Sequence, residues 1–245
     1  MHLKLIFTLA ALLLPASVFA QQNSIKNSEQ AIVVTTKDWN VLQGAAQLFE
    51  RANKNSAWKP IGKSFSVVVG KNGLGWSDDE RMKAESEPHK REGDGKAPAG
   101  IFRLTSAFGS SAKPSFVKLP FTQLTETVEC VDDSNSKQYN LIVDNKNVPS
   151  DWTSSEKMLA VGAQYDLGVF VAHNSNPPEK QKGSCIFLHI WKSDSTGTAG
   201  CTAMKRENIE TVLSWLDQKK NPVLIQMPES DYKRFQTLWK LPKLK

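Results

Sequence analysis

The sequence predicts a mainly β domain with one prominent α-helix after Cys201 and a short helix near the C-terminus. Two observations lead to this fold class. Short runs of β-branched and apolar residues, separated by clusters of Gly, Asn, Asp and Ser, fill the first three quarters of the chain. Helical spacing of apolar residues appears only near the end. The 245 residues are enough for one domain with a substantial core.

Each predicted element follows from its own pattern. Strands are expected at 31–36, 45–51, 65–69, 127–131, 139–143, 168–172, 185–191 and 223–227. A helix is expected over 207–219, where Ile209, Val212, Leu213 and Leu216 recur at helical spacing and Pro222 follows. A second, short helix is expected over 232–239. Without the remaining evidence, 93–100 reads only as a turn-rich loop.

The first twenty residues have the pattern of a signal peptide. Lys4 precedes an apolar run over 5–14, and small residues up to Ala20 form a cleavage site. A run of about 10 apolar residues is shorter than the ~20 that span a bilayer, and no later segment comes close. We expect an exported chain, periplasmic or secreted to the cell wall. The expected layout is a signal peptide at 1–20, a linker at 21–30, a domain at 31–228 and a helical extension at 229–245.

The charge of the chain argues against a nucleic-acid partner. The formal net charge is +6, and it falls to about +5 when the signal peptide is removed. The basic residues are dispersed rather than collected in an arm with interleaved aromatics. They are expected to form a solvated surface.

Three cysteines in an exported chain leave an odd thiol. Cys130 and Cys185 lie in strand-like runs, and they are expected to be either a disulfide pair or two buried thiols. Cys201 lies in a loop of small residues and is expected to be free. Sequence alone does not show whether Cys130 and Cys185 come within bridging distance.

A histidine and a cysteine form the candidate reactive pair. If 185–191 is a strand, Ile186, Leu188 and Ile190 share one face, and His189 lies on the other, which is open to a cleft. Cys185 would lie roughly 13 Å from His189 along that strand, so Cys201 is the thiol for His189 to activate. The same distance argues against a zinc site, for which the candidate ligands would be His173, Cys185, His189 and Cys201.

The loop before Cys201 is suited to acyl transfer. Small residues at Thr198, Ala199 and Gly200 allow close approach of backbone to ligand, and the following helix is expected to direct its positive end toward this loop. The N–H groups of Gly200 and Cys201 are candidate oxyanion donors.

These motifs resemble those of the YkuD-type L,D-transpeptidase catalytic family. Its signature is a His followed at modest distance by Ser/Thr-x-Gly-Cys, and this chain has His189 and then Thr198-Ala-Gly-Cys201. A second family-like element is the run 93–104, Gly-Asp-Gly-Lys-Ala-Pro-Ala-Gly-Ile-Phe-Arg-Leu. The resemblance spans about 31–228 and implies a β-rich fold of mixed sheets.

The resemblance also implies a reaction. A cysteine thiolate attacks a peptidoglycan tetrapeptide stem at its third residue, D-alanine leaves, and an amine from another stem resolves the thioester. It assigns Cys201 as nucleophile, His189 as general base and Gly200 with Cys201 as oxyanion donors, with the Ile190 carbonyl orienting the imidazole. Carbapenem-type compounds are expected inhibitors, and no cofactor is indicated.

The motifs assign the substrate-binding residues less closely than the catalytic ones. Ser184, Trp191, Thr198, Asn174 and Arg103 are candidates, although Trp191 would equally suit the core, Asn174 a turn and Arg103 an ordinary strand charge. The family often has Gly or Ser after the His, His before the Gly-Cys pair and Arg two residues after the Cys. This chain has Ile190, Ala199 and Ala203 there.

The missing Arg leaves the source of a cation open between Lys205, Arg206 and Arg103. Gly-Cys-x-Ala-Met also resembles a subset of the family with hydrolytic members. An L,D-carboxypeptidase or endopeptidase on the same thiol, and an inactive wall-binding module, therefore remain alternatives.

Overall fold

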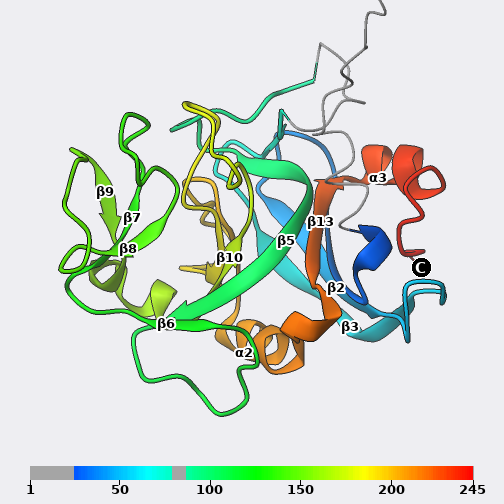
Figure 1. Ribbon diagram of the computed structural model, residues 1–245. Coiled ribbons are helices and arrows are strands. Elements are labelled where there is room, and N and C mark those ends of the chain that lie inside the picture. Colours follow the sequence, from blue (N-terminus) through cyan, green and yellow to red (C-terminus); the bar gives the residue numbers. More distant parts are fainter. Residues whose placement is uncertain (1–24, 79–86, 245) are drawn as a thin grey trace, which may run out of the picture.

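The computed structural model describes residues 25–78 and 87–244, and within them the protein is mainly β (Figure 1). The prediction of a β-rich fold with mixed sheets and few helices is confirmed. The predicted signal peptide at 1–20 lies outside the described residues, as does most of the predicted linker.

A closed sheet forms the body of the molecule. Its strands follow the order β10-β11-β12-β3-β2-β1-β13-β5, and a further pairing of β10 with β5 completes the ring. Their bounds are β1 Gln30–Thr36, β2 Gln43–Glu50, β3 Lys59–Val68, β5 Ala97–Gly109, β10 Gly168–Val171, β11 Phe187–Ile190, β12 Thr202–Met204 and β13 Val223–Pro228. Two short strands, β4 (Leu74–Trp76) and β6 (Phe121–Gln123), pair parallel with β5. Closure leaves the ring few free edges.

Strands β1 and β13 carry the centre of the core. Every residue of both strands is buried, and they pair in parallel from Ala31 with Val223 to Thr36 with Pro228. When both faces of a strand are covered, its sequence is a continuous apolar run without alternation. Residues 223–227 have such a run, and it predicted the strand.

A second, three-stranded sheet lies beside the ring (Figure 1). It consists of β7 (Val128–Val131) between β8 (Ile142–Asp144) and β9 (Ser155–Lys157), and a 3₁₀ segment, η1 (Met158–Tyr165), leads back to β10. A disulfide joins Cys130 of β7 to Cys185, just before β11. The disulfide therefore attaches the small sheet to the strand that carries His189.

The two predicted helices are present with different ends. α2 (Arg206–Trp215) buries Ile209, Val212 and Leu213, but it ends at Trp215 because Leu216 is extended, with φ −58° and ψ 132°. Lys219 and Lys220 lie instead in a separate 3₁₀ turn, η2 (Gln218–Lys220). The last helix, α3 (Glu229–Gln236), begins three residues earlier than the predicted 232–239 and packs Tyr232 and Phe235 into the core.

Two strand predictions and one loop prediction need correction. The strand predicted over 185–191 is shorter, because Cys185 has φ 53° and only Phe187–Ile190 is extended and paired. The strand predicted over 139–143 begins at Ile142, since Asn140 also has a positive φ of 63°. The glycine-rich run 93–100 is a loop only as far as residue 96. Its second half opens β5, a strand of 13 residues.

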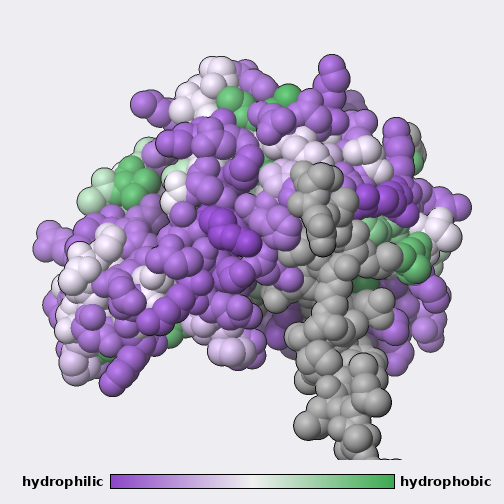
Figure 2. All heavy atoms as spheres, turned by 90° about the horizontal axis from the view of Figure 1, so that it is seen from above, coloured by the Kyte–Doolittle hydropathy of each residue, from purple (hydrophilic) through white to green (hydrophobic). Residues whose placement is uncertain are grey.

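One face of the molecule is mainly polar. Figure 2 shows a face covered mainly by hydrophilic residues, with hydrophobic ones in small separate groups. No helix within the described part of the chain is long and apolar enough to cross a membrane.

Candidate active site

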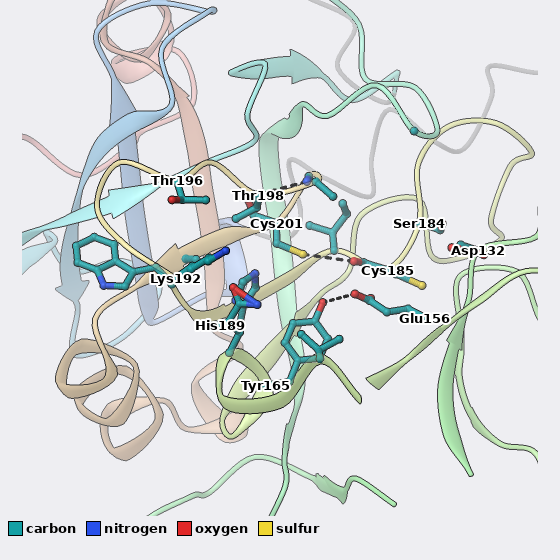
Figure 3. Close-up of a pocket in the computed structure, with 18 of the residues that line it drawn as sticks. Asp132, Glu156, Tyr165, Ser184, Cys185, His189, Lys192, Thr196, Thr198 and Cys201 are labelled. Carbon is teal, nitrogen blue, oxygen red and sulfur yellow. Dashed lines mark hydrogen bonds between the residues drawn. The ribbon is translucent and has the colours of Figure 1, made fainter. Parts of the chain in front are cut away.

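Cys201 lines a cleft of 470 Å³ to which the ring and the small sheet both contribute residues (Figure 3). Its thiol is free and buried. Cys201 immediately precedes β12, which pairs in parallel with β11, and the Phe187 N–H of β11 lies 3.3 Å from its Sγ. A backbone N–H directed at sulfur stabilises a thiolate more than a thiol.

His189 reaches the same cleft from β11. The predicted alternation of this strand is observed, with Leu188 and Ile190 in the main core and the His189 ring against Tyr165, at 5.2 Å between centroids. Its Nδ1 lies 2.8 Å from the Ile190 carbonyl oxygen, as the resemblance implied. A carbonyl can only accept, so Nδ1 carries the hydrogen and Nε2 is left as the proton acceptor.

The thiol and the imidazole are both neutral in this environment. Burial raises the pKa of the Cys201 thiol to about 12, and the nearby Glu156 charge adds to the effect. Burial also lowers the pKa of His189 to about 4, against the hydrogen bond to Ile190. The proton therefore remains on sulfur until a reaction moves it, and His189 is ready to receive it.

Tyr165, at the end of η1, links the thiol to a carboxylate. Its hydroxyl donates to Oε1 of Glu156 at 2.8 Å (Figure 3). Tyr165 also lines the cleft with Cys201 and lowers the pKa of the Cys201 thiol, opposing part of the effect of burial. Neither Tyr165 nor Glu156 belongs to a sequence motif, and both become neighbours of Cys201 only because the small sheet packs on the ring.

Thr198 organises the loop before the thiol. Its hydroxyl donates to the Cys201 carbonyl at 2.6 Å and accepts from the Gly200 N–H at 3.1 Å. One of the two expected oxyanion donors is thus engaged with a side chain at rest. The loop itself is fixed to the end of β3, since Thr198 N–H donates to Val69 O at 3.0 Å.

The expected helix N-terminus is not at the thiol. The extended residues of β12 separate Cys201 from α2, which begins at Arg206. At about 3.3 Å per extended residue, the three residues of β12 place the N-terminus of α2 roughly 10 Å from Cys201 along the strand. The dipole of α2 therefore does not account for reactivity at Cys201.

The glycine-rich run 93–100 positions a buried cation. Asp94 accepts from the Lys90 ammonium at 2.6 Å and from the backbone N–H groups of Arg91 and Lys96. Lys90 is only 3% exposed, lines the cleft, and lies 3.8 Å from where a Cβ on Gly200 would be. This cation was not among the candidates that the sequence offered.

The three cations considered from sequence do not line the cleft. Arg206 pairs with Asp166 at 2.5 Å, and the Arg103 side chain is exposed from β5. Lys205 is exposed just before α2. Lys90 and the exposed Lys192 are the lysines of the cleft among the described residues.

The remaining predicted residues divide between the cleft and its supports. Ser184 and Trp191 line the cleft, and the Ser184 hydroxyl donates to Glu92 at 2.8 Å. Asn174 does not line it. Its side chain instead bridges Glu179 and Gly183 within a loop, so the turn interpretation describes its position. His173 is buried, and its Nε2 bonds to the Lys182 carbonyl.

The disulfide decides the roles of the other two cysteines. Cys185 is bonded to Cys130, so its sulfur is not available as a nucleophile or a metal ligand. The four-residue zinc set considered from sequence therefore lacks one of its members.

The comparison with protein families agrees with this arrangement. The family model of the L,D-transpeptidase catalytic domain, YkuD, matches residues 45–225. The chain belongs to this family. The match begins within β2 and ends within β13, and it contains Cys201, His189, Lys90 and the disulfide. No curated protein and no solved structure gave a match to the chain.

Membership of this family makes the chain one with an L,D-transpeptidase-type catalytic domain, of a family that acts on peptidoglycan. Residues that sequence reasoning missed are Lys90, Tyr165, Glu156 and the backbone N–H of Phe187. Lys90 and Asp94 are four residues apart and pair with each other, but their spacing alone did not show that the pair lies in the cleft. No local signal marks Tyr165 or Glu156.

Proposed function

We propose that this protein is an exported cysteine L,D-transpeptidase that joins peptidoglycan stem peptides. The observation that supports this most is a free thiol, Cys201, and a neutral imidazole, His189, lining one cleft of an L,D-transpeptidase-type domain. The signal-peptide pattern of 1–20 supports export to the periplasm or the cell wall.

The proposed acylation step starts from a neutral Cys201 thiol and a neutral His189 imidazole. The Cys201 sulfur attacks the carbonyl carbon of the third stem residue while its proton passes to Nε2 of His189. The Cys201 N–H, and the Gly200 N–H once it leaves Thr198, stabilise the oxyanion. His189 then protonates the departing amine of D-alanine, and a thioester remains on Cys201.

The cations of the cleft suit an anionic peptide. We infer that buried Lys90, which is paired with Asp94, attracts a carboxylate of the stem, and that exposed Lys192 assists from the same cleft. In this chain Lys90 takes the part that the resemblance gave to an Arg two residues after the Cys. Ser184 and Trp191 are the proposed flanking contacts.

The test is an incubation of the purified protein with muropeptides that carry tetrapeptide stems, with products identified by mass. Dimers linked through the third residue are the expected result. Tripeptides without dimers would indicate an L,D-carboxypeptidase, shortened cross-links an endopeptidase, and no change with either wild type or Cys201→Ala a wall-binding module. A carbapenem adduct on Cys201 is an additional expected result.

A further inference from the structure

Two carboxylates face the cleft on the side of Cys201 opposite His189. In the view of Figure 3, Glu156 and Asp132 lie to one side of the thiol, and His189 and Lys192 lie to the other. Both acids come from the small sheet, Asp132 directly after β7 and Glu156 from within β9. The acylation step described above uses neither of them.

These carboxylates lack a cation. Across 25–78 and 87–244, neither Glu156 nor Asp132 forms an ion pair, and the group that donates to Glu156 is the neutral hydroxyl of Tyr165. The Oδ1 atom of Asp132 is buried without a hydrogen-bond partner. Burial and the charge of Asp132 together raise the pKa of Glu156. An unpartnered buried acceptor is costly, so this wall of the cleft is suited to a positively charged donor.

The second half of the proposed reaction requires such a donor and a second base. An acceptor amine is an ammonium ion near neutral pH, and forming an amide from it removes two protons. One of them returns to the Cys201 sulfur as it leaves. A neutral His189 carries that proton but has no capacity for the other.

We propose that Glu156 and Asp132 bind the ammonium group of the acceptor and that Glu156 takes its first proton. This inference rests on the proposed transpeptidase function. The resulting neutral amine attacks the thioester carbonyl, a C–N bond forms and the C–S bond breaks. The second proton passes from nitrogen through His189 to sulfur, which restores the thiol, and Glu156 releases the first proton to solvent.

Tyr165 positions the proposed ammonium site by its hydrogen bond to Glu156. Its hydroxyl donates to Oε1 of Glu156 at 2.8 Å, and Tyr165, Glu156 and Cys201 line the same cleft, so an amine bound at Glu156 shares that cleft with the acylated sulfur. Water, unlike an ammonium ion, is already neutral, so it can attack the thioester without first losing a proton to Glu156. The carboxylates therefore favour transfer to an amine over hydrolysis by concentrating the amine and neutralising it.

The test compares two acceptors on the same acyl-enzyme. Glycinamide is largely an ammonium ion at pH 7, whereas hydroxylamine is largely neutral and needs no such base. Wild type and Glu156→Gln are acylated with a tetrapeptide donor, acylation is followed by mass, and partition to each acceptor is measured. Glutamine keeps an oxygen for Tyr165 but accepts no proton.

Glu156→Gln should retain acylation and transfer to hydroxylamine but lose transfer to glycinamide by about 10-fold, because about a tenth of an α-amine is already neutral at pH 7. Raising the pH to 10 should restore it, because the amine then deprotonates in solution. Glu126→Gln is the matched control, since Glu126 is an exposed acid of the segment leading into β7. Asp132→Asn should weaken glycinamide binding and leave hydroxylamine transfer unchanged.

An equal effect of Glu156→Gln on both acceptors, or none on either, would overturn the ammonium site and leave the proposed transpeptidase intact. If Glu156→Gln does not fold, the acceptor preference of Asp132→Asn decides in the same way. Failure of the wild type to form any acyl-enzyme would overturn the proposed function itself, and the ammonium site with it.

Discussion

Nδ1 of His189 lies 2.8 Å from the carbonyl oxygen of Ile190, so the backbone of β11 fixes the tautomer of the imidazole that it carries. This contact leaves Nε2 as the basic atom in the cleft. It joins two consecutive residues, and it therefore survives wherever β11 keeps its extended conformation. Because the imidazole is also buried, His189 is neutral at a pH where it would carry a charge in the unfolded chain.

Stability should fall as pH falls below neutrality. Burial lowers the folded-state pKa of His189 from 6.5 to about 4, so the unfolded chain binds a proton that the folded chain resists. The stabilisation is complete above pH 6.5 and is lost progressively down to about pH 4, to a total of roughly 3 kcal/mol. Urea unfolding of wild type and His189→Gln at pH 7 and pH 4.5 measures this.

The variant should show a smaller pH dependence than wild type. It should retain some, because burial also lowers the pKa of His173 to about 4. Identical dependence in the two proteins would show that His189 is not buried in its neutral form.

The thiol of Cys201 should be unreactive in the resting protein. With its pKa raised from 9.0 to about 12 by burial, the thiolate fraction is about 10³-fold lower than for an ordinary cysteine. Iodoacetamide labelling at pH 7, followed by mass, should be correspondingly slow and should rise with pH. Cys201→Ser is the blank. Rapid labelling that levels off below pH 8 would instead indicate a thiolate and imidazolium pair.

Removing the Cys130–Cys185 disulfide should destabilise the protein substantially. The bond closes a sequence separation of 55 residues, for which the loss of unfolded-state entropy is worth about 4 kcal/mol. The double variant Cys130→Ser/Cys185→Ser should show this loss in denaturant unfolding. Because the bond also attaches the small sheet to β11, transfer activity should fall as well. Full activity together with full stability would contradict both expectations.

Lys90 and Asp94 should behave as a buried ion pair. Their side chains are 3% and 17% exposed, so Lys90→Met leaves Asp94 with an uncompensated charge and should cost about 3 kcal/mol. The double variant Lys90→Met/Asp94→Asn should recover part of that loss. Arg206→Met is the matched control, because its pair with Asp166 is 44% and 33% exposed and should contribute under about 1 kcal/mol.

Activity separates a packing role of Lys90 from a binding role. If Lys90 attracts a stem carboxylate, Lys90→Met should raise KM for tetrapeptide donors more than it lowers kcat. A donor whose carboxylates are amidated should show no such difference between the two proteins. A purely structural lysine would affect both donors alike.

Local patterns in the sequence determined much of this protein. The spacing of His189 and the Thr198-Ala-Gly-Cys201 run, and the alternation along β11, depend on backbone geometry within a few residues, and they identified the reactive pair. The continuous apolar run of β13 and the helical spacing of α2 were equally local. Their ends were less predictable, because single residues such as Cys185 and Leu216 leave the regular conformation in response to packing.

Only the tertiary structure decided what surrounds the thiol. Glu156 comes from the small sheet, Tyr165 from η1, and Lys90 from a loop more than a hundred residues before Cys201. No rule of sequence spacing therefore relates these three residues to Cys201. Ring closure through β5 and β10, and the disulfide to the small sheet, bring them together. The resulting burial moves the proton of the Cys201 and His189 pair onto sulfur, an effect of desolvation that exists only once the chain is folded.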